Sequence, residues 1–371
     1  MVTPDLPAAA PRPRRRGRRR LLDALSLVLV AAIFGLVLPR IASYREVGEV
    51  LGALGWATLL GLLAIAVWNL VTYWLVTVAI LPSLRLREAA VAALGSTAVS
   101  NTLPAGAALG MGVTWRMFAS WGVASEDFAL FTLVSGVWNQ FVKLGMPLLA
   151  LALLVTAGNA DPALVTAAVI GVAVLAAAVL ALVLVLRSER LAERVGTVLQ
   201  RIVDVLFGLI RRPAPARVAA GCVEFRSRAV HVLGARGWWI TLTTLVSHLT
   251  LWLVLLVSLR ACGVGGDEVP WQESLAAFAF VRLLTALPLT PGGLGVVELG
   301  LTGPLAAGLG SEGAARVAAG VLLYRALTYA LPIPLGALSL LWWRLNRSWR
   351  LTPADRAARR ARHRGLAGVR A

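Results

Sequence analysis

Five ionisable side chains interrupt long apolar runs of the sequence: Lys143, His248, Arg282, Glu298 and Arg325. An ionisable residue inside a membrane is costly, and it usually marks a binding site or an ion pair. Only Glu298 is acidic, so the set carries positive charge that suits a phosphate-bearing head group. Lys143 is the only lysine of the chain, so its position does not reflect a generally high lysine content.

Arg282 and Glu298 flank the proline at position 291 at similar distances along the chain. At about 1.5 Å per helical residue, the two side chains reach similar depths on facing limbs of a hairpin, and we expect them to pair. The pair either pins the hairpin or acts as a gate or coupling pair, and the sequence leaves both roles open. Arg325 and Lys143 then remain as uncompensated charges, and we expect Arg325 to contact phosphate.

The stretch LPLTPGGLGVVELGL interrupts an apolar run with Pro291, Gly292, Gly293 and Gly295. A membrane tolerates such a break only where protein or a water-filled cavity covers the unpaired backbone groups. The half-helix that follows directs its N-terminal N–H groups at the break, and such a terminus favours an anion. The break is typical of a substrate site, but glycines also permit close helix packing without a ligand. Its spacing matches neither a Walker A loop nor a dinucleotide-binding fingerprint.

A second break, NTLPAG, lies in the N-terminal half of the chain, and polar residues follow it. The candidate site residues of this half are Asn101, Pro104, Gly106, Arg116, Asn139 and Lys143. Interhelical hydrogen bonding explains buried asparagines equally well, so this assignment has a purely structural alternative.

No arrangement typical of an enzyme is found in the sequence. A serine–histidine–aspartate set, metal-ligand spacing and paired carboxylates are absent, so we predict no catalytic residue, no metal and no cofactor. Of three histidines, only His248 lies in an apolar run, where helix packing is the more common role. Cys222 and Cys262 form no disulfide framework.

The composition defines the elements that must position these residues. Hydrophobic residues make up 58% of the 371 residues, charged residues 15%, and the mean hydropathy is +0.79. A soluble protein carries about 25% charged residues, so the chain is predicted to be an all-α polytopic membrane protein. Its predicted spans are 21–38, 54–81, 128–156, 163–186, 238–261 and 314–343. Two further runs, 87–120 and 271–308, are predicted to be broken helical hairpins, either re-entrant or paired.

The net charge of +18 comes from arginines that flank the apolar runs. This distribution indicates topology and attraction to anionic lipid, and it argues against nucleic-acid binding. It predicts a basic cytoplasmic tail at 1–20, a membrane domain at 21–345 and a second basic cytoplasmic tail at 346–371. Within the membrane domain, the loop 187–236 is predicted to be cytoplasmic and to contain an amphipathic helix on the membrane surface.

With this topology the two broken hairpins enter from opposite faces of the membrane, as inverted repeats of secondary transporters do. The same number of residues separates Pro104 from Pro147 as separates Pro291 from Pro334. The equal spacing favours an internal duplication, although a chain with 18 prolines offers many pairs by chance.

The segments ALPLTPGGLGVVELGL and VLLYRALTYALPIPLGALSLLWWR resemble the flippase-like family known as the lysylphosphatidylglycerol synthase transmembrane region. The resemblance covers about residues 21–345 and implies a multi-pass protein of the bacterial plasma membrane that handles lipids or lipid-linked molecules. The positions carried over from the motif are Pro291, Gly292, Gly293, Gly295, Glu298 and Arg325. Many relatives have an acidic residue in the first hairpin where this chain has Gly112. The aminoacyl-transfer domain of the synthases is not expected, because the chain ends shortly after its last span.

The sequence is compatible with three functions, of which an embedded transferase is the third. The first is a transporter or flippase-like protein that moves or binds an anionic lipid or a lipid-linked intermediate. The second is a non-transporting scaffold that binds lipid beside a partner enzyme of envelope or glycolipid synthesis. The opposed hairpins favour the transporter, and the missing acidic residue in the first hairpin favours the scaffold.

Overall fold

The computed structural model describes residues 44–103, 106–156, 162–209, 218–285, 290–346, 349, 351–352 and 354–355. Throughout these residues the regular structure is helical, with no strand, in agreement with the all-α prediction. Four stretches are long and apolar enough to cross a membrane: Trp56–Ile80, Val169–Arg187, Phe225–Ala261 and Ser311–Leu345. They coincide with four of the six predicted spans. The predicted span 21–38 lies outside the described residues, and the run 128–156 forms helix α7 (Ser125–Thr156).

The first broken hairpin consists of α5 (Leu86–Thr102) and α6 (Gly106–Ser120), which pack against each other. It follows the short helix α3 (Tyr44–Gly52) and the long helix α4 (Trp56–Ile80). Helix α5 begins where the sequence predicts, because the carboxylate of Glu88 accepts a hydrogen bond of 2.9 Å from the backbone N–H of Arg85. The predicted break between the two limbs is confirmed.

Helices α7, α8 (Pro162–Arg187), α9 (Glu189–Leu209) and α10 (Val218–Ala261) follow the first hairpin. Helix α9 is the predicted amphipathic helix, and its apolar side chains Val195, Val198, Leu199, Ile202 and Val205 are exposed. Helix α10 differs from the prediction, because it begins 20 residues before the predicted span 238–261. Its early part is held by an ion pair of 3.2 Å between Arg228 and Asp127 of α7.

The second broken hairpin consists of α11 (Trp271–Leu284), the 3₁₀ turn η2 (Pro291–Gly293) and α12 (Val296–Leu305). The last predicted span is one long helical stretch with an irregular turn in its middle. This stretch comprises α13 (Ser311–Arg325), the π-helical turn η3 (Ala326–Ala330) and α14 (Pro332–Leu345).

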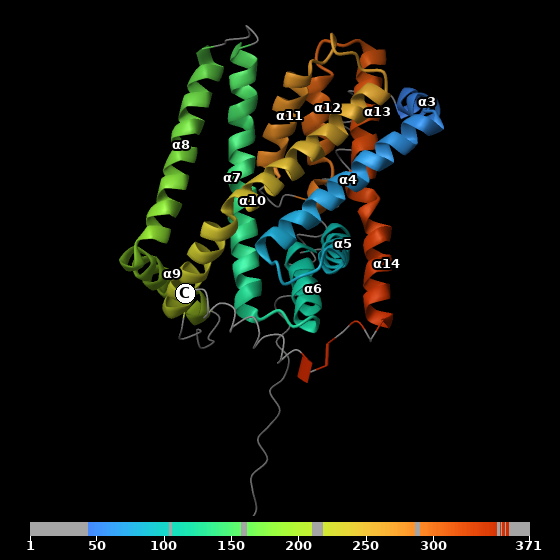
Figure 1. The fold of residues 1–371 in the computed structure, drawn as a ribbon. Coiled ribbons are helices and arrows are strands. Elements are labelled where there is room, and N and C mark those ends of the chain that lie inside the picture. The colour runs from blue at the N-terminus through green and yellow to red at the C-terminus, as the bar shows by residue number, and fades with distance from the viewer. Residues whose placement is uncertain are drawn as a thin grey trace, which may run out of the picture.

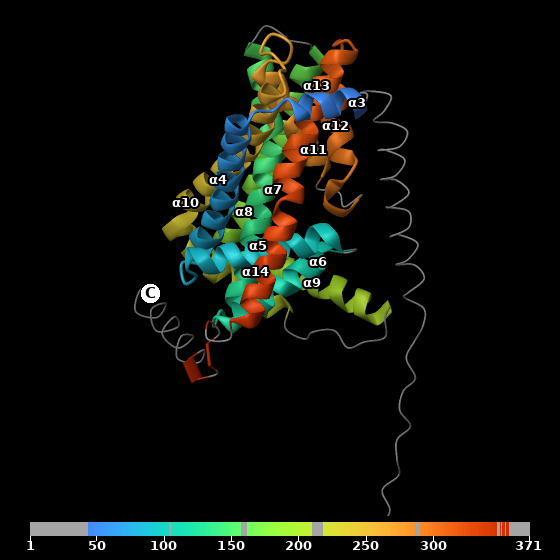
Figure 2. The same cartoon turned by 90° about the vertical axis from the view of Figure 1, so that its right-hand side faces the viewer.

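The two hairpins lie at opposite ends of the bundle. In Figure 1, α11 and α12 lie in the upper part of the helical bundle and α5 and α6 in its lower part, towards the end at which α9 lies. In Figure 2 the same end carries α9, which projects away from the long helices. The long stretch from α13 to α14 passes both hairpins, since α12 contacts α13 and α5 contacts α14.

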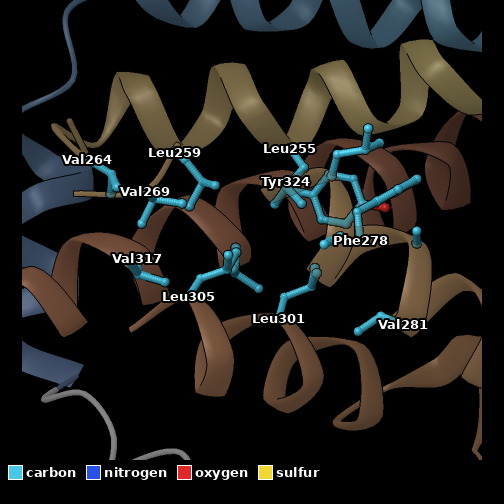
Figure 3. Close-up of a cluster of buried hydrophobic side chains, with 14 of the residues drawn as sticks. Leu255, Leu259, Val264, Val269, Phe278, Val281, Leu301, Leu305, Val317 and Tyr324 are labelled. Atoms are coloured by element: carbon cyan, nitrogen blue, oxygen red, sulfur yellow. The ribbon is translucent and has the colours of Figure 1, made fainter. Parts of the chain in front are cut away.

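Each hairpin has its own hydrophobic core. The larger core joins α10, α11, α12 and α13 around Leu255, Phe278, Leu301 and Val317, as Figure 3 shows. A second core surrounds α5 and α6 and contains Met117, Phe118 and Trp121. The turn η2 of the second hairpin contacts α5 of the first, so the two breaks approach each other between these cores.

Candidate functional site: the junction of the two hairpin breaks

The break in the second hairpin depends on glycine. Gly292, Gly293 and Gly295 have φ angles of 60°, 69° and 80°, a region that side chains with a Cβ atom rarely adopt. A Cβ atom on Gly292 would also collide with the ring of Tyr329. The loop closes through a hydrogen bond of 2.9 Å from the Thr290 hydroxyl to the carbonyl of Leu294. The glycines therefore create a turn that brings backbone close to the long stretch α13–α14.

Glu298 lies in the first turn of α12 and is only 2% exposed. One carboxylate oxygen, Oε2, accepts a hydrogen bond of 2.7 Å from the backbone N–H of Gly295. This contact satisfies an otherwise free N–H group at the helix start and places negative charge where the helix dipole favours it. Because α12 begins only at Val296, the carboxylate is directed back to the glycine turn.

The other oxygen of Glu298, Oε1, forms an ion pair of 2.7 Å with Nε of Arg325. Arg325 also donates from Nη2 to the carbonyl of Gly292 at 3.0 Å, and its guanidinium lies 4.4 Å from the centre of the Tyr329 ring. The predicted pair of Glu298 with Arg282 is therefore wrong. The carboxylate is directed at the glycine turn and the C-terminal end of α13, not across to α11.

Tyr329 joins the two hairpins. Its hydroxyl donates to the carbonyl of Asn101 at 2.7 Å, and the Asn101 side-chain amide donates to the carbonyl of Tyr329 at 3.2 Å. Tyr329 lies in the π-helical turn, where Leu331 N–H bonds to the carbonyl of Ala326. Pro332 follows and has no N–H for the next helical bond, which explains the wide turn. The end of α5 is thus bound to the segment that also holds Glu298.

A group of basic residues lies beside this junction. Arg282 of α11, Lys143 of α7 and His248 of α10 influence one another electrostatically. The ring N–H of His248 at Nδ1 is 3.0 Å from the carbonyl of Thr244, within the same helix. The tyrosines Tyr73 and Tyr324 interact with Arg282. Lys143 and Arg282, both predicted site residues, therefore belong to one group of interacting side chains.

Other predicted site residues lie elsewhere or serve helix structure. Arg116 is exposed on α6, and Asn139 donates to the carbonyl of Ser135 within α7 at 2.8 Å. Gly106 is buried at the start of α6, where a Cβ atom would collide with the carbonyl of Ser100. Pro104 lies outside the described residues, and the side chain of Pro291 is not described although its backbone belongs to η2.

The sequence interpretation missed the tyrosines. The chain has only four, and three of them, Tyr73, Tyr324 and Tyr329, lie in the junction or beside the basic group. Two of them, Tyr324 and Tyr329, belong to the run LLYRALTY, in which the sequence predicts only Arg325 as a site residue. The rarity of tyrosine in this chain was the signal that would have identified them.

Fold and site together define a multi-pass membrane protein built around two broken helical hairpins. A family model described as the lysylphosphatidylglycerol synthase TM region matches residues 20–336, and the chain belongs to this family. The family connects the chain with lipid-related processes in membranes. A comparison with curated protein sequences gives no significant match. Within the described residues, no group of three or more histidine, cysteine or acidic residues is placed to hold a metal ion.

Proposed function

We propose that the protein is a flippase-like lipid transporter that moves an anionic lipid or a lipid-linked intermediate between the leaflets of a bacterial plasma membrane. The observation that carries this proposal is the contact between the two hairpin breaks through Tyr329 and Asn101. Broken helices from opposite ends of a bundle that meet at mid-depth are the arrangement from which secondary transporters build substrate sites.

The orientation follows from charge. The end that carries α9 contains Arg187 in the last turn of α8 and Arg344 in the last turn of α14, whereas the opposite end contains Asp267 and Glu268. Helix α9 itself is balanced, with three arginines and three acidic residues. Positive charge remains on the cytoplasmic side, so the first hairpin enters from the cytoplasm and the second from the other face. The two hairpins then act as inverted, re-entrant elements, and both termini are cytoplasmic.

In this proposal the Glu298–Arg325 pair is the gate. The pair connects the glycine turn of the second hairpin to the long stretch α13–α14, and Tyr329 connects that stretch to the first hairpin. Separation of the pair would release the turn at Gly292 and loosen the contact between the breaks. An anionic head group that competes for Arg325 would favour this separation.

The test is lipid movement in vesicles that contain the purified protein. Fluorescent phosphatidylglycerol in the inner leaflet becomes accessible to a membrane-impermeant quencher only after it crosses. Wild-type protein is expected to raise the crossing rate over that of protein-free vesicles, and Glu298→Gln is expected to reduce it. A folded Glu298→Gln protein with the wild-type rate would remove the gate role.

A scaffold remains the second candidate, because the junction is satisfied without a ligand. Both oxygens of Glu298 and two donor groups of Arg325 are bonded within the protein. If the protein is a scaffold, lipid is expected to cross vesicles that contain it no faster than it crosses protein-free vesicles. An enzyme of envelope or glycolipid synthesis is then expected to co-purify stably with the protein from the native membrane.

A further inference from the structure

The basic residues beside the junction form a second site, separate from the Glu298–Arg325 pair. Arg282, Lys143 and His248 come from three different helices, α11, α7 and α10, which pack against one another. The positive charge of Arg282 acts on both Lys143 and His248, and that of Lys143 acts on His248. Among the described residues, no carboxylate forms an ion pair with any of the three.

Two polar atoms in this group are buried without a hydrogen-bond partner within the described part of the chain. They are Nε of Arg282 and Nε2 of His248, and His248 is only 5% exposed. Buried polar atoms are nearly always hydrogen-bonded, and buried cations inside a membrane nearly always have a counter-charge. A phosphate group that retains one hydroxyl would supply both, because its charged oxygens accept from Arg282 and its hydroxyl donates to Nε2 of His248.

The nearest carboxylate of the junction does not fill this role. Glu298 gives one oxygen to the Gly295 N–H and the other to Arg325. Arg325 interacts unfavourably with Arg282, so the neighbouring pair does not neutralise the basic group. Tyr73 and Tyr324 interact electrostatically with Arg282 but carry no carboxylate that would neutralise it.

An apolar groove adjoins the basic group along α7. It is a shallow, widely open groove with a volume of about 460 Å³, and its lining includes Gly136, Gln140, Phe141 and Leu144 of α7 and Leu182 of α8. Lys143 lies two helical turns after Gly136, so it stands at the edge of the helix face that lines the groove. A ligand with its anion at Lys143 therefore has room for a hydrocarbon chain next to it.

We propose that Arg282, Lys143 and His248 bind the phosphate group of a lipid whose acyl chain occupies the groove between α7 and α8. This inference rests on the proposed function, since it specifies the head group of the lipid that the protein moves. Arg282 and Lys143 supply charge-assisted donors to the phosphate oxygens. His248 donates from Nδ1 to the Thr244 carbonyl, so Nε2 of the neutral ring is a free acceptor for a hydroxyl of the phosphate group.

The test measures ligand-induced thermal stabilisation of the full chain in an uncharged detergent. The probes are dioctanoyl phosphatidic acid, dioctanoylglycerol, which has the same chains without phosphate, and inorganic phosphate. The variants are Lys143→Gln and Arg282→Gln, and the control is Arg45→Gln, which removes an exposed charge on α3.

Phosphatidic acid is expected to stabilise the wild type at lower concentration than either other probe. Lys143→Gln and Arg282→Gln each lose one charged donor, so each is expected to bind phosphatidic acid about tenfold more weakly, whereas Arg45→Gln is expected to keep wild-type affinity. Without ligand, Arg282→Gln is expected to melt at or above the wild-type temperature, because it removes an unpaired buried charge. A merely structural arginine would give a lower melting temperature.

Equal binding of phosphatidic acid by the wild type and both variants would overturn the site. Equal stabilisation by dioctanoylglycerol would overturn the role of phosphate. Inorganic phosphate that binds as tightly as phosphatidic acid, and loses affinity in the variants, would retain the anion site and overturn the lipid assignment. If the wild type moves lipid and Lys143→Gln binds phosphatidic acid as tightly as the wild type, this inference is refuted and the proposed transport is not. If Lys143→Gln loses phosphatidic acid binding but the wild type moves no lipid, the proposed transport is refuted and the binding site is not.

Discussion

The two broken hairpins occupy comparable places in the fold but are held together by different forces. The first packs through small residues: a Cβ atom on Gly110 would collide with Ser100, and one on Gly336 of α14 would collide with the Leu94 carbonyl of α5. The second is held by the Glu298–Arg325 pair and by three glycines with positive φ.

This difference predicts that the two hairpins respond differently to a ligand. Backbone packing responds little to a ligand, because close van der Waals contacts have no charge with which an anion competes. A buried ion pair has two partners that an anionic ligand can separate. For the proposed pathway we therefore expect the first hairpin to be a fixed wall and the second to be the movable part.

The largest effect is expected at the ion pair. Glu298→Leu leaves Arg325, whose side chain is 12% exposed, without its partner, and loss of one member of a buried pair costs about 3–5 kcal/mol of unfolding free energy. Unfolding of the purified protein in detergent, followed by tryptophan fluorescence, measures this loss.

The double variant Glu298→Leu, Arg325→Leu is the control for that prediction. Removal of both charges is expected to restore most of the stability, since a buried pair contributes little beyond apolar side chains of similar size. A double variant as unstable as Glu298→Leu alone would mean that the carboxylate stabilises the turn at Gly295 more than it stabilises Arg325.

The next effect tests the packed half. Gly336→Ala places a methyl group against the Leu94 carbonyl and Ala98, and overpacking of this kind costs about 1–3 kcal/mol. Gly303→Ala on α12 is the matched control, because no atom lies within 4 Å of its added Cβ. Equal stabilities of the two alanine variants would show that α5 and α14 separate easily, which would contradict the fixed wall.

The sequence predicted the breaks well because proline and glycine mark them directly. The limits of the first hairpin, 87–120, and of its break agree with α5 and α6. The partner of Glu298 was not predictable from spacing along the hairpin. Equal depth on two limbs does not give the direction of a side chain, and the first turn of α12 directs Glu298 towards Arg325.

The start of α10 was missed for a related reason. The sequence predicts a cytoplasmic loop up to position 236, but a helix can continue through polar residues where one of its faces packs against neighbours. Ala229 is buried in this part, and Arg228 is paired with Asp127. The sequence pattern records polarity, whereas the helix limit depends on tertiary contacts.

A smaller effect is expected where the two hairpins touch. Tyr329→Phe keeps the ring beside Arg325 but loses the hydrogen bond to the Asn101 carbonyl, at a cost of about 1 kcal/mol. Amide hydrogen exchange in peptides that cover the end of α5 is expected to rise, while exchange in α8 stays constant. Asn101→Ala removes the reciprocal bond, and the two substitutions are expected to be non-additive because they break one contact.

The smallest effect is expected at the arginine of the first hairpin. Arg116 is exposed on α6, and the structure gives its side chain no ion pair within the described residues, so Arg116→Gln is expected to change the unfolding free energy by less than about 0.5 kcal/mol. Arg325→Gln, measured beside it, is expected to be clearly destabilising because Glu298 stays buried. Equal losses in the two variants would mean that Arg116 also has a buried partner, and the first hairpin would then be a second charged gate. A loss of unfolding free energy in Arg325→Gln alone would mean that only the second hairpin depends on an ion pair. This result would agree with a first hairpin held by close packing and a second held by charge.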